Sequence, residues 1–194
     1  MEYRLNKNSL MDILQNWNHF LRRRVRLVAC GGTAMTLVDV KESTKDIDFM
    51  VPDHKEHAYL LSVLADLEYK PITTAGWKKE GDIFVFDLFR GNKIHTTELL
   101  ESPLADGRNQ EIKRFSHLYV GVLNFYDLIS SKIFRGTTVD IDDCTQLYRA
   151  KSGEIDIQTL TDHYREMVSY DTSEARIEVQ IDHFVEHLRE EGLL

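Results

Sequence analysis

The chain runs Val25-Arg26-Leu27-Val28-Ala29-Cys30-Gly31-Gly32-Thr33 and, after a polar link, Lys45-Asp46-Ile47-Asp48-Phe49. The apolar residues 25–30 predict a short strand, and the glycine pair predicts a tight turn into a helix over 33–38. Residues 46–51 predict a second strand, which ends before a proline. A strand, a glycine turn and a helix start can hold phosphate, because glycine lets the backbone approach closely and free N–H groups attract anions. A glycine turn alone is a weak signal, since tight strand–helix turns are common.

Asp46 and Asp48 are two residues apart on the second predicted strand. Side chains at this spacing share one face of a strand, with Cα atoms roughly 7 Å apart, so the two carboxylates can converge on one cation. Two acids on one face repel each other unless a cation neutralises them, and Mg²⁺ favours one or two carboxylates together with phosphate oxygens. A solvated sheet edge would also explain an Asp-x-Asp pair by itself.

A third acid, Asp87, interrupts the apolar run of residues 83–89, which predicts another strand. Burial of an unpaired carboxylate is unfavourable, so an acid in such a strand needs a partner or solvent. If this strand lies beside Asp46 and Asp48, three carboxylates gather near the glycine turn. Such a trio can hold two divalent cations about 4 Å apart for in-line displacement at phosphorus. The alternative is an Asp at a strand end that faces solvent.

The remaining pattern divides the chain into an α/β head and a helical tail. Apolar spacing predicts two more helices and one more strand in the head, over residues 10–21, 58–67 and 117–123. From Asn124 onward the periodicity is helical, with Asn124 and Asp127 in a capping arrangement. The predicted fold class is α/β (α+β), with a small mixed sheet in residues 1–123. Residues 124–194 form a helical part that packs on this core, because no flexible linker separates the two.

The composition is that of an ordinary globular protein. The 194 residues include 24 Lys or Arg and 32 Asp or Glu, for a net charge of −8. An acidic total argues against a protein that coats nucleic acid through many phosphate contacts, yet residues 1–35 carry six basic and two acidic side chains. No uncharged stretch approaches the roughly 20 apolar residues of a membrane helix, and the start does not resemble a signal peptide. Cys30 and Cys144 cannot supply a disulfide framework, so we expect a cytoplasmic protein.

These residues together resemble a known superfamily. The segments 31–33, 44–49 and 87–89 resemble the nucleotidyltransferases related to DNA polymerase beta. More narrowly, the chain is similar to the abortive-infection nucleotidyltransferase toxins of bacterial and archaeal toxin–antitoxin pairs. In the second half, residues 127–143 resemble the helix pair that follows the catalytic sheet there, although Val139 stands where the family often has Arg or Lys.

The resemblance implies a metal-dependent enzyme that moves a nucleoside monophosphate from a nucleoside triphosphate, such as ATP, to an acceptor hydroxyl. The acceptor would be an RNA or tRNA end or a protein, and a cognate antitoxin would be a partner. Three acids would be catalytic and would hold Mg²⁺ or Mn²⁺: Asp46, Asp48 and Asp87. Six residues would bind the nucleotide: Gly31, Gly32, Thr33, Lys132, Asp140 and Asp143. Of the acids, Asp87 would help to deprotonate the acceptor.

Three other functions stay open. The first is a nucleotidyltransferase-fold protein that binds nucleotide or a partner without catalysis, although the intact trio of acids argues against it. The second is a nucleotidyltransferase that modifies a small molecule of the aminoglycoside type. The third is a nucleotide-sugar glycosyltransferase, which also uses Asp-x-Asp, but the nearby glycine turn and the later Lys/Asp block fit that class less well.

Other charged residues allow more than one interpretation. Asp140 and Asp143 also fit the first turn of a helix, where the dipole favours acids. The four arginines in residues 22–26 are the best local candidate for contact with an RNA backbone, although any one of them could simply cover a helix end. His183 and His187 have a spacing that can bind metal, but no third ligand is evident and a solvated helix face is the better interpretation.

Overall fold

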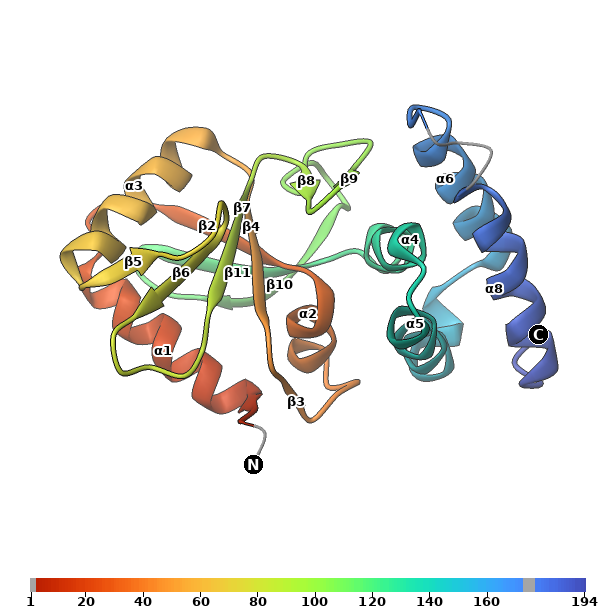
Figure 1. Ribbon diagram of the computed structural model, residues 1–194, viewed down its shortest axis with the longest axis horizontal. Coiled ribbons are helices and arrows are strands. Elements are labelled where there is room, and N and C mark those ends of the chain that lie inside the picture. Colours follow the sequence, from red (N-terminus) through yellow and green to blue (C-terminus); the bar gives the residue numbers. More distant parts are fainter. Residues whose placement is uncertain (1–2, 173–176) are drawn as a thin grey trace.

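A seven-stranded mixed sheet forms the core of the protein, and its strand order is β10-β11-β2-β4-β7-β6-β5 (Figure 1). The computed structural model describes residues 3–172 and 177–194. The strands are β2 (Val25–Ala29), β4 (Ile47–Val51), β5 (Tyr69–Pro71), β6 (Gly76–Lys79), β7 (Phe86–Arg90), β10 (Asn109–Arg114) and β11 (Leu118–Leu123). Strand β2 is parallel to β11 and antiparallel to β4, and β4 is parallel to β7. Two short pairs lie outside this sheet: β1 (Leu5–Asn6) with β3 (Ser43–Thr44), and β8 (Lys93–Ile94) with β9 (Thr97–Glu98).

Helices cover both faces of the sheet. Helices α1 (Lys7–Phe20) and α3 (His54–Asp66) lie on one side, and α2 (Gly31–Leu37) lies on the other (Figure 1). Apolar residues recur along α1 at helical spacing, and Trp17 packs on the sheet with its ring centroid 4.7 Å from that of Phe86. The indole N–H of Trp17 also donates to the hydroxyl of Tyr69, 3.3 Å away. Apart from the partly exposed Arg26 and Asp48, the residues of the central strands β2 and β4 are apolar and buried, because helices cover both faces of the sheet.

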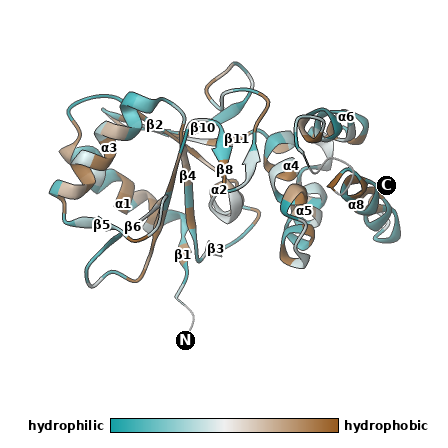
Figure 2. Cartoon of the chain, turned by 45° about the horizontal axis from the view of Figure 1, so that its top comes forward, coloured by the Kyte–Doolittle hydropathy of each residue, from teal (hydrophilic) through white to brown (hydrophobic). Residues whose placement is uncertain are grey.

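The described residues after β11 are mostly helical. It contains α4 (Phe125–Arg135), α5 (Thr138–Lys151), a short 3-10 turn (Ser152–Glu154), α6 (Ile157–Val168) and α8 (Val179–Glu190). Side chains cap three of these helices: Asn124, Thr137 and Asp156 accept the N–H groups of Asp127, Asp140 and Thr159. Figure 2 shows hydrophobic and hydrophilic residues alternating along these helices, which is the pattern of helices with one buried face. None of the helices in the described ranges is long and apolar enough to cross a membrane.

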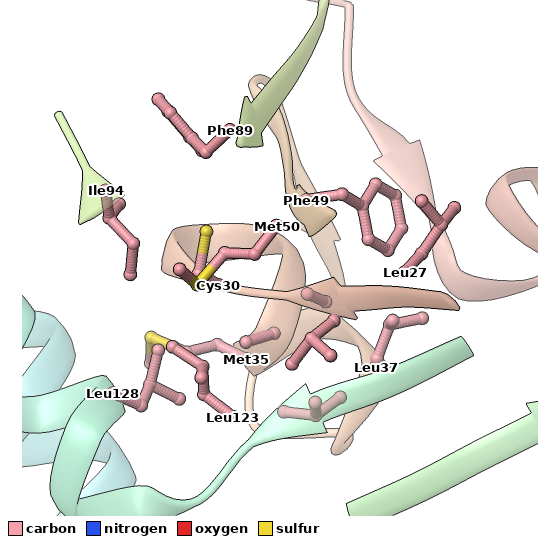
Figure 3. Close-up of a cluster of buried hydrophobic side chains, with 14 of the residues drawn as sticks. Leu27, Cys30, Met35, Leu37, Phe49, Met50, Phe89, Ile94, Leu123 and Leu128 are labelled. Carbon is pink, nitrogen blue, oxygen red and sulfur yellow. The ribbon is translucent and has the colours of Figure 1, made fainter. Parts of the chain in front are cut away.

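One hydrophobic cluster joins the sheet to the helices beside the glycine turn. Figure 3 shows Cys30 and Met35 packed among Met50, Leu123 and Leu128, which come from β4, β11 and α4. These side chains are all fully buried or nearly so. The cluster fixes the start of α2 against the sheet and against α4, so the turn between them is rigidly supported.

The predicted fold class is confirmed: the protein has a mixed sheet and a helical C-terminal part. The expected strand over 83–89 is wrong in its first half, because β7 begins only at Phe86. Ile83 is 51% exposed, so its apolar side chain does not belong to the buried sheet. Strands β5, β6 and β10 were not predicted, because they lie at or near the sheet edges and β10 alternates charged and polar residues.

Candidate active site

Two carboxylates stand side by side at the centre of the sheet. Asp48 on β4 is directly opposite Asp87 on the parallel strand β7. Residues paired in this way project to the same face of a sheet. Asp46 lies two residues before Asp48, immediately ahead of β4. The structure therefore brings together two of the three predicted acids and places the third at the adjoining strand start.

Gly31 lies against the Asp48 carboxylate at the first turn of α2. Its φ of +56° is a conformation that glycine adopts without strain. A Cβ atom at this position would lie 2.6 Å from Oδ2 of Asp48, which is closer than any real contact. The glycine is therefore needed twice, for the backbone turn and for the space that the carboxylate occupies.

Thr33 positions the segment that carries the acids. Its buried hydroxyl accepts the backbone N–H of Asp48 at 2.9 Å and donates to the carbonyl of Asp46 at 3.0 Å. Thr44 donates to the same carbonyl at 2.8 Å. The hydroxyl of Thr33 is therefore used within the protein. A bound anion would instead meet the backbone N–H groups of Gly31, Gly32 and Thr33 at the start of α2.

The ionised forms of Asp48 and Asp87 are disfavoured in the folded protein. Burial raises the pKa of Asp48 from 3.8 to about 7, and the negative charges of Asp87 and Asp46 add to this effect. Burial likewise raises the pKa of Asp87, and Asp46 again adds to it. Arg135 and Lys132 oppose the shift of Asp48 only in part. Perturbed acids of this kind cluster at functional sites.

These residues fit a divalent cation. Asp48 and Asp87 offer two carboxylates on one face, which is the ligand number that Mg²⁺ usually takes from protein when phosphates supply the rest. Their mutual repulsion would be relieved by a bound positive charge. Among the described residues, no group of three His, Cys, Asp or Glu side chains already has a metal-binding arrangement. Any third ligand, such as Asp46, must therefore turn inward or come from a substrate.

Lys132 belongs to a buried ionic network on the helical side. Its side chain is 3% exposed, and its Nζ lies 2.7 Å from Oδ2 of Asp143 and 3.4 Å from Oδ1 of Asp140. Arg135 donates to Asp140 at 2.5 Å, and Lys41 pairs with Asp143. Burial opposes ionisation of Asp140, but Thr137 and the two basic side chains lower its pKa overall. Both predicted carboxylates thus face Lys132, which they hold in place.

The network and the acids meet across a small cavity. Its volume is about 10 Å³, and its lining includes Gly31, Asp48, His95, Lys132 and Arg135. A space of this size holds about one water-sized group. The structure therefore places the predicted Lys132 close to the predicted acids and the glycine turn, although these residues come from distant parts of the sequence.

His95 and Arg135 were not among the predicted site residues. His95 lies in the β8–β9 hairpin with a φ of +51°, and its ring packs edge-on against Phe89 at 4.7 Å. Burial and the charge of Arg135 lower its pKa, while Asp87 opposes this shift. No local motif marks His95 in the sequence. Arg135 lies three residues after Lys132 on α4, which is about one helical turn, so its proximity to Lys132 follows from the helix alone.

A larger pocket is also lined by residues of the β8–β9 hairpin and of α4. Its volume is about 540 Å³, and its lining includes Lys93, Thr96, Arg108, Phe134 and Tyr170. Pockets of roughly 300–1,000 Å³ are typical of small-molecule sites. The hairpin and α4 contribute lining residues to both spaces, but the two linings share no residue.

Comparison with known proteins identifies the family. Residues 8–190 match the sequence profile of a family described as "Nucleotidyltransferase of unknown function (DUF6036)". The chain belongs to this nucleotidyltransferase family. The predicted membership of the nucleotidyltransferase superfamily is thereby confirmed. No curated protein sequence matches the chain.

Two solved structures of similar architecture extend over almost the whole chain. One is ANT(2″)-Ia in complex with adenylyl-2″-tobramycin. The two chains are 14% identical, the match covers 92% of this chain and 97% of that chain, and the TM-score is 0.45. The other is an antigenic nucleotidyltransferase-like protein from Paracoccidioides brasiliensis, with 12% identity, 97% and 91% covered, and a TM-score of 0.46.

Proposed function

We propose that this DUF6036 nucleotidyltransferase transfers a nucleoside monophosphate from a nucleoside triphosphate to an acceptor hydroxyl, with a divalent cation bound at Asp48 and Asp87. The observation that carries the proposal is the direct pairing of these two acids against Gly31, at the start of α2. The raised pKa of Asp48 supports it, because a buried acid pair is unfavourable without a compensating cation.

Each residue has a defined task in this proposal. A bound divalent cation would supply positive charge to the triphosphate. The backbone N–H groups of Gly31, Gly32 and Thr33 bind phosphate oxygens, while the Thr33 hydroxyl keeps Asp46 and Asp48 in place. Lys132 contributes a positive charge across the small cavity. Because their carboxylates face Lys132, Asp140 and Asp143 have a positioning role.

Asp87 is the proposed base in the transfer step. Without a cation, burial raises its pKa; a cation bound at Asp48 and Asp87 would lower this pKa again, so that the carboxylate is ionised and able to accept a proton. The carboxylate takes the proton of the acceptor hydroxyl, and the acceptor oxygen forms a bond to the α-phosphorus. The bond from that phosphorus to the pyrophosphate oxygen breaks, and pyrophosphate leaves with the electron pair. Such a reaction depends on positioning and charge neutralisation more than on covalent help from the protein.

Labelled nucleotides test this function directly. The protein is incubated with each of the four α-labelled nucleoside triphosphates, Mg²⁺ or Mn²⁺, and either total RNA or a cell lysate. We expect label to enter RNA or protein with the wild type and not with Asp48→Asn. The matched control is Asp12→Asn, which removes the same charge from an exposed position on α1. Transfer by Asp48→Asn at the wild-type rate would refute the assignment.

A further inference from the structure

Five exposed basic side chains surround the end of the sheet where β2 and β11 begin, and we name this surface the basic end: Arg22, Arg23, Arg24, Lys113 and Arg114. Strand pairing brings these two sequence segments together. Val25 and Leu118 are partners in the parallel pair, and the N–H of Val25 donates to the carbonyl of His117 at 2.9 Å. On the other side of β11, Arg114 is paired with Tyr119.

Most of these positive charges have no acidic partner. In the described ranges, Arg22, Arg23, Arg24 and Lys113 form no ion pair, whereas Arg114 pairs with Glu111. The next arginine along the chain, Arg26, is different, because Glu56 and Asp53 neutralise it. A chain with a net charge of −8 thus keeps a local group of unpaired cations at one end of its sheet. Such a group attracts a polyanion.

Aromatic rings accompany the cations. The guanidinium carbon of Arg23 lies 5.5 Å from the ring centre of Tyr59, and that of Arg114 lies 5.1 Å from Tyr119. Phe20, at the end of α1 and two residues before Arg22, is 55% exposed. A basic surface with an exposed aromatic ring is the combination that binds single-stranded nucleic acid, through phosphate contacts and base stacking.

We propose that the basic end binds the phosphodiester backbone of a single-stranded nucleic acid segment. The surface lies at the opposite end of β2 from the carboxylates, with six residues from Arg24 to Cys30, or roughly 20 Å at the rise of a strand. A stacked strand advances about 3.4 Å per nucleotide, so about six nucleotides would span this distance. Strand binding at the basic end does not depend on the proposed nucleotide transfer. Only the idea that the bound strand is the acceptor rests on the proposed function.

Salt-dependent binding tests the proposal. Fluorescence anisotropy with labelled RNA and DNA strands of about twelve nucleotides, twice the span, gives the affinity at several salt concentrations. We expect wild-type binding to weaken with salt, and Arg22→Gln/Arg23→Gln/Arg24→Gln to lose at least tenfold in affinity near 0.1 M salt. Each phosphate contact on a single strand adds about 0.7 to the slope of log affinity against log salt, so the slope should fall by about 2.

A matched variant separates the surface from overall charge. Lys70→Gln/Lys78→Gln/Lys79→Gln removes three positive charges from β5 and β6, at the other edge of the sheet. Its affinity should remain within about twofold of the wild type, because these side chains lie outside the basic end. Equal losses in both triple variants, or no binding by the wild type to either strand, would overturn the proposal. A loss of affinity confined to the arginine variant supports the proposal. Comparison of the RNA strand with the DNA strand then shows which of the two nucleic acids the basic end prefers.

Two further variants keep the result independent of folding and of catalysis. Arg22 donates to the carbonyl of His19 and so closes α1, but Arg23→Gln/Arg24→Gln keeps this contact and should still lower the slope by about 1.4. Asp48→Asn should bind the strands as the wild type does. If the strands bind but no nucleotide is transferred, the proposed function is wrong and the nucleic acid site is supported. If nucleotide is transferred but no strand binds, the nucleic acid site is wrong and the proposed function is supported.

Discussion

Replacing Asp48 by Asn should stabilise the protein in the absence of divalent cations. Its folded pKa of about 7 lies above the ordinary 3.8, so the ionised form is disfavoured in the folded state by about 4 kcal/mol at pH 8. Partial exposure of the side chain to solvent reduces this to about 2 kcal/mol. Asparagine has the same shape and no charge, so the variant removes this penalty and nothing else of similar size.

The pH dependence gives the sign of the effect. A carboxyl with a raised folded pKa destabilises the fold as pH rises from 3.8 through about 7, because the unfolded chain ionises first. The gain from Asp48→Asn should therefore be about 2 kcal/mol at pH 8 and under about 1 kcal/mol at pH 5. Urea unfolding in EDTA at both pH values measures it, with Asp12→Asn as the control. A gain that is absent at pH 8, or equal at the two pH values, would refute the reasoning.

Three further substitutions test the site. Gly31→Ala should lower the free energy of unfolding in urea by about 1–3 kcal/mol and should lower transfer, because Gly31 has a positive φ and lies against the Asp48 carboxylate. The control is Gly107→Ala: a Cβ atom there meets nothing within 4 Å, so the variant should cost only the strain of its positive φ and leave transfer unchanged. Thr33→Val leaves the backbone N–H of Asp48 without its partner and removes one of the two donors to the carbonyl of Asp46. It should cost about 1–3 kcal/mol in the same assay, while Thr33→Ser should recover most of this loss. Lys132→Met removes one cation from two buried carboxylates, although Asp140 keeps Arg135 and Asp143 keeps Lys41. It should cost about 1–3 kcal/mol, part of which Asp143→Asn in the same chain restores; thermal melts that show no recovery would contradict the buried pairing.

The glycine turn and the spacing of Asp46 and Asp48 at the start of β4 could be predicted because they depend on local rules. Glycine is required where φ is positive, and residues two apart share a strand face, so Gly31, Asp46 and Asp48 form a recognisable pattern in sequence. The partnership of Asp87 with Asp48 is different in kind. It depends on which strand lies next to β4 and in which register, and both are set by tertiary packing over a separation of 39 residues.

The role of Lys132 shows where sequence reasoning reaches its limit. The family resemblance implies that Lys132 meets phosphate charge, which stays a prediction; in the structure its side chain lines the small cavity beside Gly31 and Asp48. Sequence could not show that Asp140 and Asp143 would face the same ammonium group, because this depends on the turn at Gly136, whose φ is +64°. His95 was missed altogether, since its position comes from a short hairpin without any recognisable motif.

The uneven charge of the chain orients any polyanionic substrate. Residues 1–35 carry four more basic than acidic side chains, whereas residues 137–194 carry nine more acidic than basic ones. The acidic helices repel a nucleic acid strand, so the basic end is the surface at which phosphates are favoured. Under the proposed function, a strand held at the basic end would bind roughly 20 Å from the carboxylates, at the rise of β2. If both proposals hold, an acidic chain would act on a nucleic acid end without coating it, because the site needs negative charge only where a cation binds.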